Sequence, residues 1–315
     1  MSDATLPRRV AIVGAGEIGS GWAALFAAHG CDVQLFDADP TAERRVLDAL
    51  ACARRLHAVD RPPGSVTVHT RLVAALDGAE WVQESLPEEP SLKRAMLTVI
   101  DTGASRSAII ASSTSTRTVS ELVAGLGCGD RTIIAHPLHP VYAVPVVELV
   151  GGPLTSPATM RRAEEVLRAL GRDPVVFRGE LRGLVSNRLT AALLREAFDL
   201  VARGVIDASD LDRLVARGIA LGWVTAGPLR TEAIAAGPKG FTGFLDALSE
   251  PLSDLWRSLA SWEELDAPQR YALERSMEDR AAAEDVAALP PGQCTWAEWL
   301  ARVEREARRG EPESP

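Results

Sequence analysis

A glycine-rich turn between an apolar run and a helical pattern constrains the fold of this chain more than any other feature. Residues 10–13 (VAIV) form a short continuous apolar run, which is typical of a buried parallel strand, and residues 14–19 (GAGEIG) follow at once. Residues 22–28 then have a helical pattern, and a second apolar run, residues 33–36, ends in Asp37. This order of strand, glycine turn, helix and strand predicts a βαβ unit of an open α/β sheet.

The glycine turn is a candidate dinucleotide-binding site. Gly14 permits a tight turn, Gly16 lets the backbone approach a pyrophosphate, and Gly19 lets helix and strand pack closely. Asp37 lies at the separation at which an acid binds the adenosine ribose, and its carboxylate repels a 2′-phosphate, which favours NAD over NADP. A purely structural βαβ turn is the alternative interpretation. The candidate cofactor-binding residues of the turn are Gly14, Gly16, Glu17, Ile18 and Gly19, whose amides begin the helix.

The order of the remaining patterns indicates two domains and a tail. A chain of 315 residues is long enough for about two domains. Strand and helical patterns alternate up to residue 177, whereas the patterns from residue 184 to residue 299 are helical. We therefore predict an α/β fold, with an N-terminal Rossmann-type doubly wound domain over residues 1–182 and an all-helical C-terminal domain over residues 183–304. The polar residues 305–315 are expected to form a disordered tail.

Charge and cysteine usage limit the partners and the location. The formal net charge of −9 argues against nucleic acid or an anionic membrane surface as the main partner. Residues 1–9 contain no apolar segment of a signal peptide, and no apolar run approaches a membrane span, which predicts a cytoplasmic protein. The four cysteines, Cys31, Cys52, Cys128 and Cys294, lack metal or disulfide spacing, so we expect reduced thiols and no metal.

His136 is the candidate catalytic base. It ends a β-branched run, and an imidazole titrates near neutral pH, but it works as a base only when a second group fixes its tautomer. Glu148 is that group by hypothesis, because an acid inside the apolar run of residues 146–150 is costly to bury without a partner. The alternative is two buried strands in which His136 is a satisfied core residue and Glu148 points to solvent.

Two polar segments follow predicted strands. Residues 84–90 combine acids and prolines at the end of a strand, which predicts a loop at the carboxyl edge of the sheet, where open α/β folds bind ligands. The hydroxyl-rich residues 112–116 are expected to serve mainly as helix caps.

Taken in order, these motifs resemble the 3-hydroxyacyl-CoA dehydrogenase superfamily, and within it the lambda-crystallin (L-gulonate 3-dehydrogenase) and L-carnitine dehydrogenase branch. The likeness covers residues 8 to about 235. Single motifs are weak, but their order and spacing together are specific. The motifs are residues 13–19, residues 84–88 with Lys93, residues 112–115, His136-Pro137 with residues 146–150, residues 183–189 and residues 227–229.

The resemblance implies roles for four catalytic residues. It makes His136 the base and Glu148 its partner. Ser115 and Asn187 match residues that hydrogen-bond the reacting oxygen of the substrate, although an asparagine early in a helix is often only a local cap. The implied reaction moves a hydride to NAD, so it needs a base for the hydroxyl proton and polar groups for the developing carbonyl.

The resemblance also implies the cofactor and the partners. Glu88 and Lys93 match residues on the nicotinamide side of NAD. The implied substrate is a small polar hydroxy acid whose 3-hydroxyl is oxidised to a 3-keto acid. The helical domain is expected to shape the substrate site and to pair in a homodimer. Two alternatives stay open, a 3-hydroxyacyl-CoA or acyl-carrier thioester dehydrogenase, and an NAD-binding structural or sensing protein without turnover.

The sequence departs from the family at two places. His139 stands where the family usually has asparagine, and imidazole is bulkier and titratable. Gly222 and Trp223 stand where the branch tends to carry an arginine and an aromatic residue, and the arginine is a plausible carboxylate clamp in relatives. Arg230 is a candidate replacement for that charge. These departures weaken an assignment to gulonate or carnitine.

Overall fold

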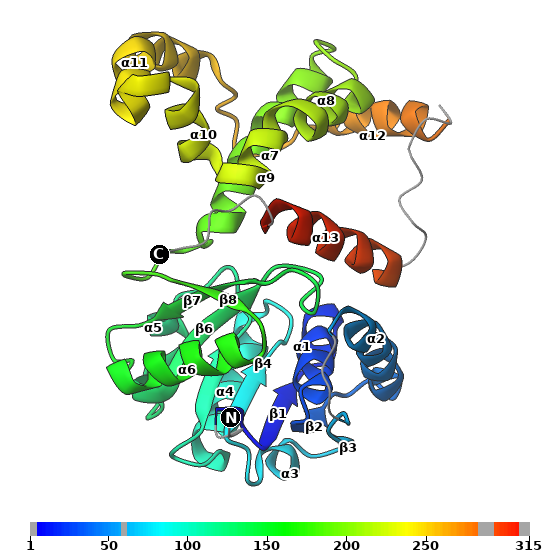
Figure 1. Cartoon of the computed structure of the whole chain (residues 1–315). Helices are drawn as coiled ribbons and strands as arrows, with labels where there is room; N and C mark the ends of the chain where they lie inside the picture. The colour runs from blue at the N-terminus through cyan, green and yellow to red at the C-terminus, as the bar shows by residue number, and fades with distance from the viewer. Residues whose placement is uncertain (1–4, 58–61, 283–292, 309–315) are drawn as a thin grey trace. The chain divides into compact units, whose positions relative to one another are not determined.

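A computed structural model describes residues 5–57, 62–282 and 293–308. It divides into two compact units (Figure 1). The first contains the described residues up to Val185 and the segment that ends at Arg302. The second contains the described residues from Ser186 to 282 and those from Val303 onward.

The first unit is built on one sheet, whose eight strands lie in the order β3-β2-β1-β4-β5-β6-β7-β8. Neighbouring strands are parallel except β6 and β7, which are antiparallel. The Rossmann-type prediction is confirmed, and the order reverses beside β1, where open sheets bind their ligands. The strands are β1 (Arg9–Val13), β2 (Asp32–Phe36), β3 (Val66–His69), β4 (Trp81–Glu84), β5 (Ile109–Ser112), β6 (Thr132–Pro137), β7 (Val146–Gly151) and β8 (Asp173–Val176).

Two hydrophobic cores form because side chains of each strand alternate between the faces of the sheet. Val10 and Ile12 of β1 face one core, and Ala11 and Val13 face the other. The first core is covered by α1 (Glu17–Ala28), α2 (Ala42–Leu56) and α6 (Pro157–Ala169), and the second by α3 (Leu72–Leu76), α4 (Pro90–Gly103) and α5 (Val119–Val123) (Figure 1).

Helix α13 (Gln293–Arg308) corrects two expectations about the C-terminal part. Its fully buried Ala297 belongs to the first core, and the Glu298 carboxylate lies 2.9 Å from Arg55 Nε of α2. Residues up to Arg302 therefore pack with the α/β unit rather than with the helical one, because alanine lets the helix approach closely. The helix also continues to Arg308, since Glu, Arg and Ala favour helix, whereas we expected the tail to begin at residue 305. Residues 309–315 lie outside the described residues.

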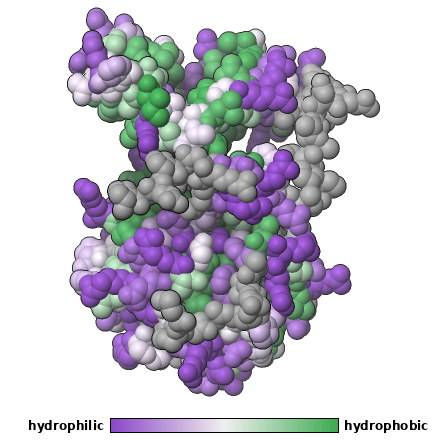
Figure 2. Space-filling view, viewed as in Figure 1, coloured by the Kyte–Doolittle hydropathy of each residue, from purple (hydrophilic) through white to green (hydrophobic). Residues whose placement is uncertain are grey.

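The second unit is helical in all its described residues apart from the short connections between helices. Val201 and Ala208 are among its few buried side chains, and many leucines are exposed. Figure 2 accordingly shows apolar surface over these helices. The helices are α7 (Val185–Ala202), which begins at the last residue of the first unit, α8 (Ala208–Leu214), α9 (Ala220–Ala226), α10 (Pro228–Ala235), α11 (Gly240–Ser258) and α12 (Ala267–Ala282). None of the described helices has both the length and the apolar composition needed to cross a membrane.

The cysteines differ from the expectation of four reduced thiols. Cys52 is disulfide-bonded, whereas Cys31 and Cys128 are buried thiols outside any disulfide. The side chain of Cys294 lies outside the described residues. Sequence spacing missed the bond because it does not show which thiols the fold brings together. The argument from reduced thiols to a reducing compartment therefore fails.

Candidate active site

The antiparallel pairing of β6 and β7 places His136 directly opposite Glu148. Opposite residues of such a pair project from the same face, so the two side chains meet. Nδ1 of His136 lies 2.9 Å from Oε2 of Glu148, and the carboxylate is buried. The interpretation in which Glu148 points to solvent is therefore wrong.

The second oxygen of Glu148 also has a partner. Its Oε1 accepts a hydrogen bond from the backbone N–H of Val185 at 2.9 Å, at the start of α7. A carboxylate held at both oxygens keeps its orientation. It then accepts a hydrogen bond from Nδ1–H of a neutral His136, which leaves Nε2 with a lone pair that can accept a proton.

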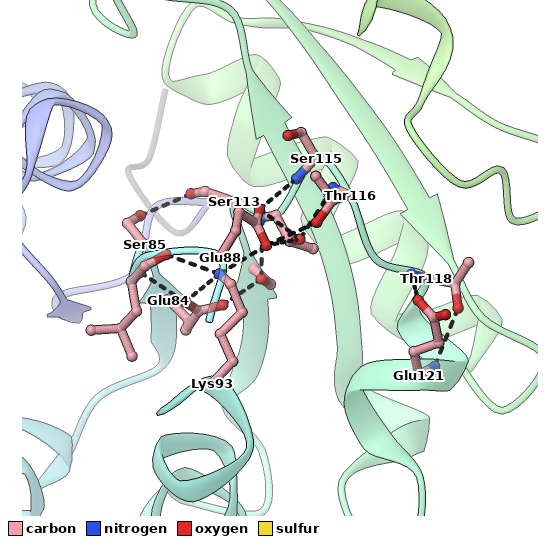
Figure 3. A network of polar contacts seen from close by, with 12 residues as sticks. Glu84, Ser85, Glu88, Lys93, Ser113, Ser115, Thr116, Thr118 and Glu121 are labelled. Atoms are coloured by element: carbon pink, nitrogen blue, oxygen red, sulfur yellow. Dashed lines mark hydrogen bonds and ion pairs between the residues drawn. The ribbon is translucent and has the colours of Figure 1, made fainter. Parts of the chain in front are cut away.

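A buried ion pair lies at the carboxyl end of β4, in the loop predicted to bind a ligand (Figure 3). Nζ of Lys93 lies 2.9 Å from Oε1 of Glu84 and 3.8 Å from Oε2 of Glu88. Glu84 has 0% exposure and Lys93 has 2%. Glu84 also accepts hydrogen bonds from Leu86 N at 2.7 Å and from Ser112 Oγ at 2.5 Å. Glu88 and Lys93 were predicted as site residues, whereas Glu84, the nearer partner of Lys93, was not.

The hydroxyl-rich segment after β5 is organised around Glu88 rather than around a helix end (Figure 3). Glu88 accepts hydrogen bonds from Thr114 Oγ1 at 2.8 Å, Ser115 N at 3.0 Å and Thr116 Oγ1 at 3.1 Å. The helix cap is Thr118 instead, in a capping box of α5. The expectation of caps at residues 112–116 is wrong because a carboxylate with three nearby donors satisfies those groups. The hydroxyl of Ser115 points away from Glu88.

The glycine turn fits a dinucleotide. Gly14 has φ of +92°, which favours glycine, and a Cβ on Gly19 would lie 1.8 Å from Gly14 O. A Cβ on Gly16 would meet nothing within 4 Å, so the backbone there borders open space. Helix α1 begins at Glu17, and its first amides have no partner within the helix. Each glycine thus has the surroundings that its predicted role requires.

Asp37 lies beside this turn, together with a residue that the sequence analysis missed. Its Oδ2 accepts a hydrogen bond from Ala15 N at 2.6 Å. Arg45 Nε donates to Ala15 O at 2.9 Å, and its Nη1 pairs with Asp39. The hydrogen bond from Thr41 N and the guanidinium of Arg45 lower the pKa of Asp39 to about 2. The positive charge of Arg45 is therefore already balanced, which leaves Asp37 as the charge facing the turn.

The loop after His136 is held by half-buried His57 and buried Arg172, which no sequence pattern indicated. Nε2 of His57 lies 2.6 Å from the carbonyl oxygen of Tyr142. Arg172 Nη1 donates to the carbonyl oxygens of Val141 and Val144, each at 3.2 Å. A neutral His57 can donate to Tyr142 O, so the loop needs His57 in a defined tautomer.

Desolvation by burial lowers the pKa of His57 from 6.5 to about 4, and Arg172 and the ring of His29 also lower it. The unfolded chain therefore binds a proton more readily between pH 6.5 and pH 4. Above pH 6.5, His57 is neutral in both states and does not lower the free energy of unfolding. We expect the free energy of unfolding to fall as the pH drops from 6.5 toward 4, because the unfolded chain then gains the proton first. Urea unfolding measures the free energy of unfolding at pH 7.5 and at pH 5. The decrease between these two pH values should be smaller in His57→Gln than in the wild type. Exposed His139→Gln is the control, and equal losses in all three proteins would contradict this assignment.

The remaining candidate residues lie in the second unit. Asn187 lies on α7 and Arg230 on α10, so their roles stay predictions. A Cβ on Gly222 would lie 2.6 Å from Thr231 Cγ2, which explains the glycine where relatives tend to carry arginine. Over the described ranges, no three His, Cys, Asp or Glu residues form a group that could hold a metal.

Two family models together match most of the chain. Residues 9–180 match the family model 3-hydroxyacyl-CoA dehydrogenase, NAD binding domain, and residues 183–271 match the C-terminal domain of the same family. An L-carnitine dehydrogenase/betainyl-CoA thioesterase of Rhizobium meliloti (strain 1021) is 38% identical over 263 residues, 82% of this chain but only 53% of that relative. This chain thus spans about half the length of that relative.

Two further similarities cover nearly whole chains. An L-carnitine dehydrogenase of Streptomyces coelicolor is 36% identical over 287 residues, which is 90% of each chain. The crystal structure of a 5-formyl-3-hydroxy-2-methylpyridine 4-carboxylic acid 5-dehydrogenase, described as an NAD⁺-dependent dismutase, has a TM-score of 0.77 and 30% identity. That match covers 96% of this chain and 99% of the other.

Proposed function

The chain belongs to the 3-hydroxyacyl-CoA dehydrogenase family, and on this basis we propose that it oxidises the 3-hydroxyl of a small polar hydroxy acid to a 3-keto acid. NAD is the cofactor, since residues 9–180 form the NAD-binding domain of the family. The observation that carries the proposal is the 2.9 Å contact between His136 and Glu148. It lies at the end of β6, on the same edge of the sheet as the glycine turn after β1.

The proposed chemistry divides between the cofactor and the protein. Bound NAD supplies the hydride acceptor. His136 Nε2 takes the hydroxyl proton, and Glu148 keeps the imidazole in the required tautomer and stabilises the imidazolium. Ser115 and Asn187 hold the reacting oxygen by hydrogen bonds. Glu88 and Lys93 hold the nicotinamide end of the cofactor.

The substrate class is supported by names of relatives. Several similar proteins are named L-carnitine dehydrogenase, and one solved structure is named for a pyridine carboxylic acid. The family name instead favours a 3-hydroxyacyl-CoA thioester as the second candidate. NADH formation should be measured with free 3-hydroxy acids and with their CoA and carrier thioesters. Turnover of thioesters alone would favour the second candidate, and NAD binding without any turnover would indicate a structural or sensing protein.

Asp37 is expected to select NAD. Its carboxylate would repel a 2′-phosphate, and Arg45, which contacts the turn at Ala15 O, is already paired with Asp39. We expect Asp37→Ala to raise kcat/KM for NADP. The ratio of kcat/KM for NAD to kcat/KM for NADP should therefore fall. Arg44→Ala, which breaks the exposed ion pair with Asp48 on α2, is the control. Equal use of NAD and NADP by the wild type would show that Asp37 does not discriminate.

The exposed leucines of the second unit support a homodimer. Leu189, Leu193 and Leu194 of α7 are all exposed, and Leu189 retains 62% of its surface. Leucines in this number are normally covered by a partner. Sedimentation equilibrium of the purified protein should give twice the chain mass, and a monomer at micromolar concentration would refute the pairing. A cytoplasmic location is also part of the proposal.

A further inference from the structure

A small pocket lies between α4 and α5. Its volume is about 250 Å³, below the range of about 300–1,000 Å³ of drug-sized sites, so it suits a small ligand. Leu97 and Leu122 supply apolar walls. The charged residues that line it are Lys93, Arg94, Arg117 and Glu121, of which Lys93 and Glu121 are labelled in Figure 3.

Two of these four charges are already balanced. Lys93 pairs with Glu84 at 2.9 Å, as described above. The Glu121 carboxylate accepts a hydrogen bond from Thr118 N at 2.9 Å and lies 3.5 Å from Arg182 Nη2. Glu121 is therefore not free to neutralise another cation fully.

The other two charges, those of the arginines, lack a carboxylate partner. Arg94 Nη1 donates to the carbonyl oxygen of Ala124, and no acid of the described residues lies within salt-bridge distance of Arg94 or Arg117. The pocket thus carries an excess of positive charge.

Arg117 adds an independent observation. Its Nε is buried and has no hydrogen-bond partner among the described residues. Buried polar groups nearly always have a partner, so the protein alone leaves this guanidinium incompletely hydrogen-bonded. A guanidinium presents its N–H groups in a planar fork that matches the oxygens of phosphate or carboxylate. Nε itself is closed to solvent, so an anion in this pocket would meet the terminal N–H groups of Arg117 and balance the excess charge.

We propose that the pocket between α4 and α5 binds a small oxyanion of the phosphate class through Arg117 and Arg94. Inorganic phosphate and a phosphate ester share the chemistry that the two guanidinium groups recognise. The site does not depend on the proposed oxidation of a hydroxy acid, because it is defined without substrate and its occupation can be measured without turnover.

The test is the melting temperature of the full chain titrated with inorganic phosphate, with sodium chloride at equal ionic strength as the reference. Near ten times the dissociation constant, binding to the folded state should raise the melting temperature of the wild type by about 2–4 °C, saturably. Arg117→Leu should remove this increase, and Arg117→Lys should restore part of it. Arg44→Leu removes an exposed arginine elsewhere and should respond like the wild type. A parallel titration with a small phosphate monoester tells whether an ester binds better than the free ion.

Three outcomes would overturn the proposal. The first is a wild type that responds to phosphate no more than to chloride. The second is an increase that Arg117→Leu retains, because phosphate would then bind elsewhere, and at the glycine turn if saturating NAD abolishes the increase. If Arg117→Leu does not fold, Arg94→Leu replaces it, because Arg94 is exposed. The third outcome is then an Arg94→Leu variant whose melting temperature rises with phosphate as much as that of the wild type.

Discussion

Replacing His136 by alanine is expected to lower kcat by about two to four orders of magnitude, the usual loss when a general base is removed. The side chain accepts the hydroxyl proton in the proposed reaction, and its Nδ1 contact with Glu148 keeps Nε2 available for that proton. NAD affinity should stay near that of the wild type, because the glycine turn follows β1, whereas His136 lies on β6. Steady-state kinetics with the best substrate, together with NAD titration by fluorescence, measures both quantities.

Two further variants separate the roles in this pair. Each carboxylate oxygen of Glu148 contacts an N–H group, and Glu148→Gln replaces one oxygen by an NH2 donor and removes the charge that stabilises the imidazolium, so its kcat should also fall by orders of magnitude. His69→Gln alters a histidine of β3 that contacts Gln34 of the neighbouring β2, on other strands than His136, and should leave kcat unchanged. A loss of tenfold or less in His136→Ala would show that another group takes the proton.

The fold and the catalytic pair could be predicted to different extents. Buried strands and the glycine turn were recognisable because apolar runs and glycine spacing are local features. The contact between His136 and Glu148 could only be hypothesised from the sequence, because it depends on the antiparallel direction and register of β7. Apolar runs indicate that a strand is buried and do not indicate which way it runs.

Most of the features that could not be predicted from the sequence depend on contacts between residues far apart in the chain. Glu84 ends a strand and looks like the start of a polar loop, yet it is buried against Lys93. His57 lies at the end of a helix and contacts a loop far along the chain. Helix α13 has a helical pattern that fits either unit, and only packing of Ala297 assigns its first part to the α/β unit. Helical periodicity identifies a buried face but not the surface that covers it.

The buried Glu84–Lys93 pair should dominate the stability of the β4–α4 loop. Lys93→Met removes the cation and leaves Glu84 fully buried with only neutral donors, so we expect a loss of about 3–5 kcal/mol in the free energy of unfolding. Arg168→Met breaks a solvent-exposed pair with Glu164 and should cost less than about 1 kcal/mol. Urea unfolding at pH 7.5 gives both values.

The double variant Glu84→Gln with Lys93→Met distinguishes an isolated buried charge from lost packing. Glutamine can still accept from Leu86 N, and a neutral side chain needs no counterion, so the double variant should recover most of the stability that Lys93→Met loses. If the double variant is as unstable as the single one, the alkyl chain of Lys93 stabilises the loop by packing. If Lys93→Met costs no more than Arg168→Met, water reaches Glu84 and the pair is not buried in solution.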